Sequence, residues 1–228
     1  MTQQAIDASR YDAILFDLDG TLIETDNRWA EQLAQRLQWV KRLHRGADIE
    51  ALSHMLVMSI ETPGNYAVAL LERLGLARYL SGIGDRIRRS KGLATRDGHE
   101  IVSGTLELLQ ALQPRFQLAV VTTRARPEAL AFVAGLGIDH FFPVVITRQD
   151  VLRMKPHPEP LLKAAAQLGV SSTRCIMVGD TTMDMRSARR AGALAVGVLS
   201  GFGTRGELER SGAEIILDRA ADLAALLR

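Results

Sequence analysis

The sequence lacks the features that mark secreted, membrane-spanning and nucleic-acid-binding proteins. It contains a single cysteine, Cys175, so an internal disulfide is impossible and a reducing, cytoplasmic setting is expected. No apolar run approaches the roughly 18 residues of a membrane-spanning helix, and the first ten residues are polar, unlike a secretory signal. The formal net charge of +2 gives no reason to expect nucleic acid as a partner. We therefore expect a soluble cytoplasmic protein.

The 228 residues have an ordinary globular composition, with 47% apolar and 24% charged residues, which is enough for a complete hydrophobic core. Short apolar runs alternate with segments of helical spacing. This alternation is typical of α/β proteins in which helices cover both faces of a parallel sheet. The expected strands are 11–16, 117–121, 142–146, 174–178, 194–198 and 214–217, and the expected helices are 103–112, 127–135, 158–168, 182–191 and 204–210.

One block of the sequence interrupts this alternation. Residues 26–92 show only helical patterns and lie between the first two strands, so we expect an inserted helical bundle. The predicted domains are a catalytic α/β core of residues 11–25 and 93–228 and a helical cap of residues 26–92. Between Arg28 and Lys91 there are eleven Lys and Arg but six Asp and Glu. Some of these cations could bind a second anionic group of a substrate, or they could simply solvate the outer helix faces.

The first motif with chemical content is Asp17-Leu18-Asp19-Gly20-Thr21, at the carboxyl end of the first strand. Ligands of open parallel sheets bind beyond this end of the strands. Two carboxylates this close can serve a cation and a reacting group, and a carboxylate can attack phosphorus to form an aspartyl-phosphate. Gly20 allows the chain to turn sharply near a ligand. The structural alternative is a turn in which the Asp side chains cap backbone amides.

Three further motifs follow other strands. Thr122 ends the second strand, where its hydroxyl and the following amides can hold a phosphoryl oxygen, although a simple cap has the same pattern. Lys155 precedes Pro156 in a loop and offers a positive charge to a phosphoryl group or a carboxylate. Asp180 follows the fourth strand and Asp184 lies four residues later, so both can face one magnesium site. Asp180 could instead be the N-cap of the next helix.

This order of motifs resembles the haloacid dehalogenase superfamily, and the insertion resembles the helical cap of its phosphoglycolate-phosphatase-like branch. The resemblance covers the chain from about Tyr11 to the end. It implies a doubly wound, Rossmann-like α/β core with an inserted all-helical cap. The implied activity is a Mg²⁺-dependent phosphatase that hydrolyses a small phosphorylated metabolite, with no nucleic acid or membrane partner. Glu24 and Thr123 stand where many relatives have Asp, and Asn or Ser, which bears on the substrate rather than on the reaction.

The resemblance also implies a role for each motif residue. Asp17 resembles the nucleophile, and Asp19 resembles the general acid/base whose backbone carbonyl also binds the metal. Thr122 and Lys155 resemble the residues that hold the phosphoryl group. The predicted substrate-binding residues are Gly20, Thr21, Thr123 and Lys155, and the predicted metal ligands are Asp17, Asp19 and Asp180, with Asp184 as a supporting carboxylate.

Other functions use similar residues. A phosphomutase of the same superfamily passes the phosphoryl group to a second sugar hydroxyl, and a nucleotide or pyrophosphate phosphatase differs only in its substrate. A catalytically silent regulatory module belongs to a different class, although every motif residue is intact. Neither the oligomeric state nor the individual substrate has a signature in the sequence. A dehalogenase is disfavoured, because members with that activity lack the second acidic residue, here Asp19, and need no metal.

Overall fold

The computed structural model describes residues 5–24 and 101–227. The chain divides into two units, residues 1–25 together with 99–228, and residues 26–98. The described residues all belong to the first unit. The predicted helical cap lies outside them, so its structure and its boundaries stay predictions. Among the residues that are described, no helix is long and apolar enough to cross a membrane.

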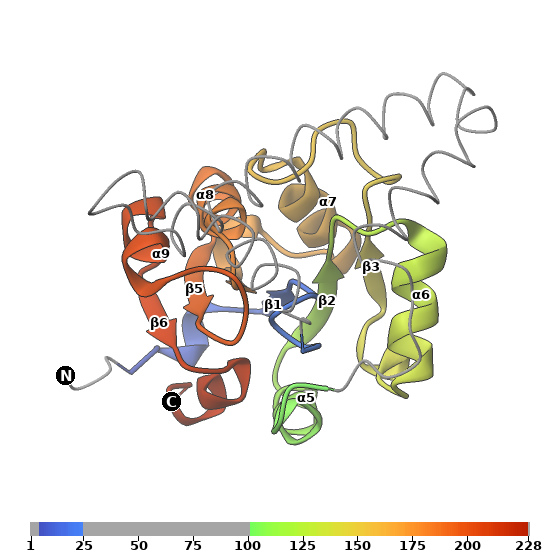
Figure 1. The fold of residues 1–228 in the computed structure, drawn as a ribbon, viewed down its shortest axis with the longest axis horizontal. Helices are drawn as coiled ribbons and strands as arrows, with labels where there is room; N and C mark the ends of the chain where they lie inside the picture. The colour runs from blue at the N-terminus through green and yellow to red at the C-terminus, as the bar shows by residue number, and fades with distance from the viewer. Residues whose placement is uncertain (1–4, 25–100, 228) are drawn as a thin grey trace, which may run out of the picture. The chain divides into compact units, whose positions relative to one another are not determined.

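A single parallel sheet with the strand order β3-β2-β1-β4-β5-β6 forms the core of the first unit (Figure 1). Its central strand, β1 (Ala13–Phe16), pairs with β2 (Gln117–Val121) and with β4 (Cys175–Gly179). All four residues of β1 are completely buried, as expected for a strand covered on both faces. The predicted α/β fold is confirmed. The outer strands are β3 (Val144–Ile146), beyond β2, and β5 (Leu194–Val198) and β6 (Ile215–Leu217), beyond β4.

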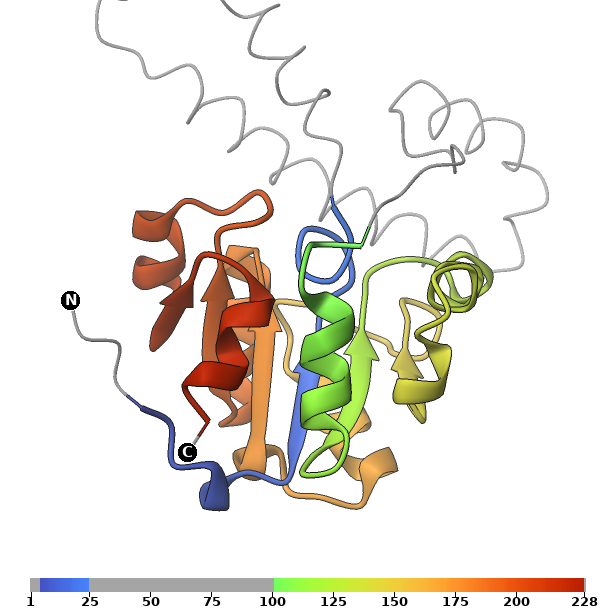
Figure 2. The ribbon, with the colours of Figure 1, turned by 90° about the horizontal axis from the view of Figure 1, so that it is seen from below.

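Helices cover both faces of this sheet (Figure 2). On one face, α5 (Thr105–Leu112) packs beside the 3-10 helix η4 (Ala220–Ala225). The opposite face is covered by α7 (Glu159–Leu168) and α8 (Thr182–Ala191), which contact the central strands. Each of these segments buries an apolar stripe against the sheet. Two further α-helices of the described residues are α6 (Arg126–Gly135), next to β3, and α9 (Arg205–Ser211), next to α8.

The predicted elements agree with the structure to within two residues at each boundary, and the differences have local causes. β1 begins at Ala13 instead of residue 11, because a short 3-10 helix (Ala8–Arg10) precedes it and the Tyr11 amide closes that turn on the Ala8 carbonyl. β3 begins at Val144, because Phe142 ends a second 3-10 helix (Asp139–Phe141). Such single turns are too short to produce a hydrophobic period, so the sequence pattern did not predict them.

Candidate active site

The predicted motif residues from different strands meet at the carboxyl edge of the sheet, beside β1. Asp17 follows β1 directly, and its backbone N–H donates to the carbonyl of Val178 in β4 over 2.9 Å. Because Phe16 pairs with Val178 in the parallel register, Asp180 leaves β4 at nearly the same level as Asp17 leaves β1. The topology therefore brings together two carboxylates that are 163 positions apart in the chain.

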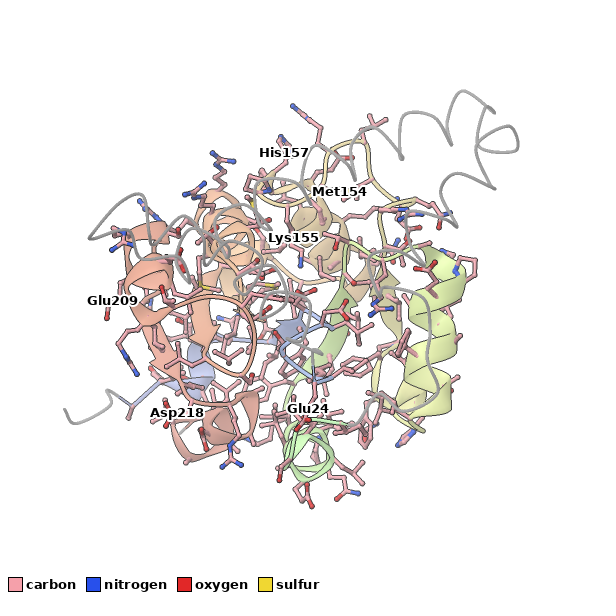
Figure 3. All side chains as sticks on the ribbon, in the orientation of Figure 1. Glu24, Met154, Lys155, His157, Glu209 and Asp218 are labelled. Carbon is pink, nitrogen blue, oxygen red and sulfur yellow. The ribbon has the colours of Figure 1, made fainter. Side chains whose placement is uncertain are left out.

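Lys155 joins three elements of this site. Its ammonium lies 2.9 Å from Asp17 Oδ1 and 2.6 Å from Asp184 Oδ1, and it also donates to the carbonyl of Val121 at the end of β2, 2.9 Å away. Only 3% of the side chain is exposed. Figure 3 shows Lys155 near the ends of β1 and β2, whereas His157 of the same loop lies farther out. Lys155 is thus held by two carboxylates and one carbonyl, which occupy the three donors of its ammonium, and its contact with a phosphoryl group stays a prediction.

Asp184 has a supporting position at the start of α8. It forms a capping box with Thr181, whose hydroxyl and backbone N–H both donate to Asp184 Oδ2, at 2.5 and 3.0 Å. Its other oxygen accepts the hydrogen bond from Lys155. Both oxygens are therefore engaged. The N-cap of α8 is Thr181, so the alternative in which Asp180 caps this helix is wrong.

Asp180 is completely buried and has one oxygen to spare. Its Oδ2 accepts the backbone N–H of Phe202 over 2.8 Å, but its Oδ1 has no hydrogen-bond partner among the described residues. A buried carboxylate oxygen without a partner is costly unless a cation or a water molecule binds it. This orphaned oxygen points to a cation-binding site next to Asp17.

A glycine-rich loop after β5 encloses Asp180, and it is not among the predicted site residues. A side chain at Gly201 would overlap the Asp180 carboxylate, and a side chain at Gly203 would overlap the Asp180 backbone carbonyl. Gly20, with φ of +71°, approaches the same carboxylate, and a side chain there would overlap both Asp180 Oδ2 and the backbone of Gly201. Ser200 fastens this loop to the first motif, because its hydroxyl donates to the Gly20 carbonyl over 2.7 Å. The sequence signal for this loop was the pair of glycines, Gly201 and Gly203, shortly after β5.

The acidic residues fit a divalent cation. One carboxylate oxygen each from Asp17, Asp180 and Asp184 lies within 4.8 Å of the others, and all three residues are buried. Asp17 and Asp180 are the natural side-chain ligands, because both oxygens of Asp184 are used by Lys155 and Thr181. Magnesium is usually held by a few carboxylates together with water and substrate oxygens, so these two aspartates are compatible with the predicted magnesium site.

Burial controls the electrostatics of this cluster in the absence of a cation. It raises the pKa of Asp17 to about 7, since Lys155 offsets only part of the desolvation and the neighbouring acids repel. Burial also raises the pKa of Asp180 well above its usual range. Burial opposes the charge of Lys155, but Asp17 and Asp184 outweigh it, so the pKa of Lys155 is raised. Several carboxylates stabilise the charged form of the one ammonium. Each carboxylate is stabilised less, because the single positive charge is divided among them.

The remaining predicted residues surround the first two strand ends. Asp19 lies beside Arg124, whose guanidinium binds both of its carboxylate oxygens, and Arg124 is not among the predicted residues. The Thr122 hydroxyl accepts the backbone N–H of Arg124 over 3.2 Å, so the capping alternative is seen, while its contact with a phosphoryl group stays a prediction. Thr21 is completely buried, and its hydroxyl has no partner within the described part of the chain. Thr123 is half-buried beside these residues.

Comparison with known proteins places these features in context. A family model described as haloacid dehalogenase-like hydrolase matches residues 14–198. The chain is 30% identical to a phosphoglycolate phosphatase of Pectobacterium atrosepticum, covering 94% of this chain and 91% of that protein. It is 28% identical to the pyrophosphatase PpaX of Bacillus pumilus, covering 96% and 97%. A solved haloacid dehalogenase family hydrolase from Deinococcus radiodurans, with bound phosphate and sodium, is similar in fold, with a TM-score of 0.65 and 25% identity over 96% and 98% of the two chains.

Proposed function

The chain belongs to the haloacid dehalogenase-like hydrolase family, and we propose that it is a phosphatase that cleaves a small phosphate monoester with Asp17 as covalent nucleophile. The observation that carries this proposal is the position of Asp17: it is buried at the end of the central strand, 2.9 Å from the Lys155 ammonium, and it forms one carboxylate cluster with Asp180, whose Oδ1 has no partner among the described residues. The phosphoglycolate phosphatase relative and the phosphate-bound structural neighbour support the same reaction.

Charge explains why these residues are needed together. A phosphate monoester is an anion, and so is the attacking carboxylate of Asp17, so the two repel each other. Lys155 reduces this repulsion from one side. We propose that Asp17 and Asp180 hold Mg²⁺, with the backbone carbonyl of Asp19 as a further ligand. The bound ion would offset the charge of the phosphoryl group and stabilise its transition state.

The reaction then has two halves. Asp17 attacks phosphorus, the ester P–O bond breaks, and Asp19 gives a proton to the leaving alkoxide. This leaves an aspartyl-phosphate at Asp17 and a carboxylate at Asp19. In the second half, Asp19 takes a proton from water as the water attacks phosphorus. Inorganic phosphate leaves, and both aspartates return to their starting states.

The identity of the substrate is the finer part of the proposal. Phosphoglycolate is the first candidate because of the phosphatase relative, and pyrophosphate is the second because of the PpaX relative. The purified protein with Mg²⁺ should release phosphate from phosphoglycolate, ethyl phosphate or p-nitrophenyl phosphate. Faster hydrolysis of pyrophosphate than of every monoester would favour the second candidate. No phosphate release from any of these compounds would contradict both.

The basic insertion leads to a test of substrate charge, although its residues lie outside the described part. If cations between Arg28 and Lys91 bind a second anionic group, kcat/KM for phosphoglycolate should exceed that for ethyl phosphate by about tenfold, or about 1.4 kcal/mol. This preference should shrink with added salt, because salt screens charges that are exposed. Equal values at low salt would instead assign these side chains to the solvated helix faces.

A further inference from the structure

Arg124 binds Asp19 through both oxygens of its carboxylate. Nε of Arg124 lies 2.7 Å from Oδ2, and Nη2 lies 2.6 Å from Oδ1. This two-point contact uses the planar fork of the guanidinium, which a lysine cannot reproduce. The two residues are 105 positions apart, so the contact exists only because β1 and β2 are neighbours in the sheet. It attaches the loop after β2 to the proposed acid/base.

The position of Arg124 is itself fixed by its surroundings. Its guanidinium carbon lies 4.1 Å from the centroid of the Phe132 ring in α6, a cation–π distance. Its backbone N–H donates to the Thr122 hydroxyl, and its carbonyl accepts the backbone N–H of Arg148, each over 3.2 Å. Burial opposes the charge of Arg124, but its hydrogen bonds and ion pair with Asp19 outweigh this, so the pKa of Arg124 is raised. A guanidinium held in this way is a rigid anchor.

We propose that Arg124 is a positioning residue that fixes the orientation of Asp19 for proton transfer, an inference that rests on the proposed phosphatase function. The Asp19 side chain is 30% exposed, so without an anchor it would rotate among several conformations in contact with water. Proton transfer needs a donor or acceptor within hydrogen-bond reach of the reacting oxygen. The two bonds from Arg124 use about half of the lone-pair positions of the carboxylate, which leaves positions that can carry the proton given to the leaving group and accept the proton taken from water.

The same chain offers a matched control at the other end of the sheet. Arg174 binds Asp12 through a similar fork, with Nη2 to Oδ1 at 2.7 Å and a second bond from Nε to Oδ2. Asp12 precedes β1 and Arg174 precedes β4, so this pair lies at the amino edge, away from the candidate site. Both side chains are more than a third exposed. Loss of this pair should leave catalysis unchanged and should report only the structural effect of removing such a fork.

Two phosphate esters with different leaving groups distinguish an effect of Arg124 on proton transfer from a general loss of structure. Ethyl phosphate needs a protonated leaving group, whereas p-nitrophenolate leaves as an anion. General acid/base catalysis contributes about 10²- to 10⁴-fold. We expect Arg124→Gln to lower kcat on ethyl phosphate about 10- to 100-fold with KM changed less than about threefold. The first equivalent of nitrophenolate should still appear at about the wild-type rate, followed by slow turnover. Arg174→Gln should stay within about twofold of wild type on both esters.

Milder variants keep the test valid if Arg124→Gln fails to fold. Arg124→Lys retains the charge but loses the fork, and Phe132→Leu removes the ring that the guanidinium stacks on. Both should show losses in the same direction, with a larger loss on ethyl phosphate than on the first p-nitrophenolate release. An equal loss on the two esters, or wild-type rates with Arg124→Lys on ethyl phosphate, would overturn the positioning role of the fork.

A double-mutant cycle gives the decisive comparison. If Arg124 acts through Asp19, then Asp19→Asn and Asp19→Asn/Arg124→Gln should have the same kcat on ethyl phosphate to within about twofold. A double variant whose losses multiply would overturn the inference, because Arg124 would then act independently of Asp19. Wild-type rates in Asp19→Asn alone would overturn the proposed acid/base function and this inference with it. The two failures are therefore distinguishable.

Discussion

The Lys155 ammonium lies 2.9 Å from Asp17 Oδ1 in a setting where only 3% of the lysine side chain and 11% of the aspartate side chain are exposed. The same ammonium also serves Asp184, so one positive charge faces several carboxylates. A buried cluster with this excess of negative charge is stable only with protons or with a further cation. This imbalance links the stability of the core to its proposed chemistry.

Removal of Lys155 should therefore lower the stability of the folded protein. We expect Lys155→Met to lower the free energy of unfolding by about 3 to 5 kcal/mol, because it leaves Asp17 and Asp184 buried without their partner. Adding Asp184→Asn to this variant should recover part of the loss. Urea denaturation measures both effects. Lys163→Met in α7 is the control, because it makes the same substitution at another lysine. It should lower the free energy of unfolding by less than about 1 kcal/mol. Equal losses for the two lysines would contradict the role of Lys155.

Stabilisation by magnesium should depend on pH. Burial raises the pKa of Asp17 to about 7 in the metal-free protein, so the stability tied to its protonated form is present below its usual pKa of 3.8 and is lost as the pH rises through 7. Mg²⁺ binds the carboxylate form and competes with protons. We expect the rise in Tm with Mg²⁺ to be larger at about pH 8 than at about pH 5. Asp180→Asn should abolish most of this rise, and a rise independent of pH would contradict the assignment.

Activity should require a small divalent cation. We expect a chelator to abolish phosphate release and Mg²⁺ to restore it. Ca²⁺ should be a poor substitute or an inhibitor, because it prefers more ligands at longer distances and would displace the Asp17 carboxylate from its attacking position. Steady-state rates with each ion after chelator treatment give the comparison. Full activity in the presence of the chelator would count against a metal held by Asp17 and Asp180.

The glycine loop after β5 should tolerate no side chain near Asp180. Gly201→Ala places a methyl group where the Asp180 carboxylate lies, so we expect at least about a tenfold fall in kcat/KM and weaker Mg²⁺ binding. Gly135→Ala in α6 is the matched control, since a methyl group there meets nothing within 4 Å. That change should leave activity intact and should raise stability by up to about 1 kcal/mol. Similar losses in both variants would contradict the enclosing role of Gly201.

Local sequence patterns predicted much of this fold and site. The features that they did not predict are tertiary contacts between residues far apart in the chain. Buried parallel strands appear as short apolar runs, so the aspartates that directly follow β1 and β4 could be placed at one edge of the sheet. The pairing of Arg124 with Asp19 spans 105 positions and has no local signature. The use of Gly201 became clear only from its contact with Asp180, because a glycine after a strand usually marks a simple turn.

The charge of Asp17 should be dispensable for folding but not for turnover. We expect Asp17→Asn to lower kcat at least about 10³-fold, because an amide neither attacks phosphorus nor binds Mg²⁺ well. Its Tm in the absence of metal should equal or exceed that of wild type, because the change relieves repulsion among the buried carboxylates. Near-normal kcat in this variant would rule out covalent catalysis by Asp17, and an unfolded variant would contradict the second expectation.

The most direct test of the central claim is to trap the phosphoryl group on the protein. Asp19→Asn should slow attack by water, and radiolabelled acetyl phosphate supplies a donor whose leaving group needs no added proton. After acid quenching, we expect up to one radiolabelled phosphoryl group per chain, which hydroxylamine should release. Borohydride should also expel the labelled phosphate while it reduces the Asp17 acyl group, which leaves homoserine at position 17. Asp17→Asn/Asp19→Asn should carry no label. Release of labelled phosphate by Asp19→Asn with no labelled protein, or label on a residue other than Asp17, would contradict the proposed mechanism.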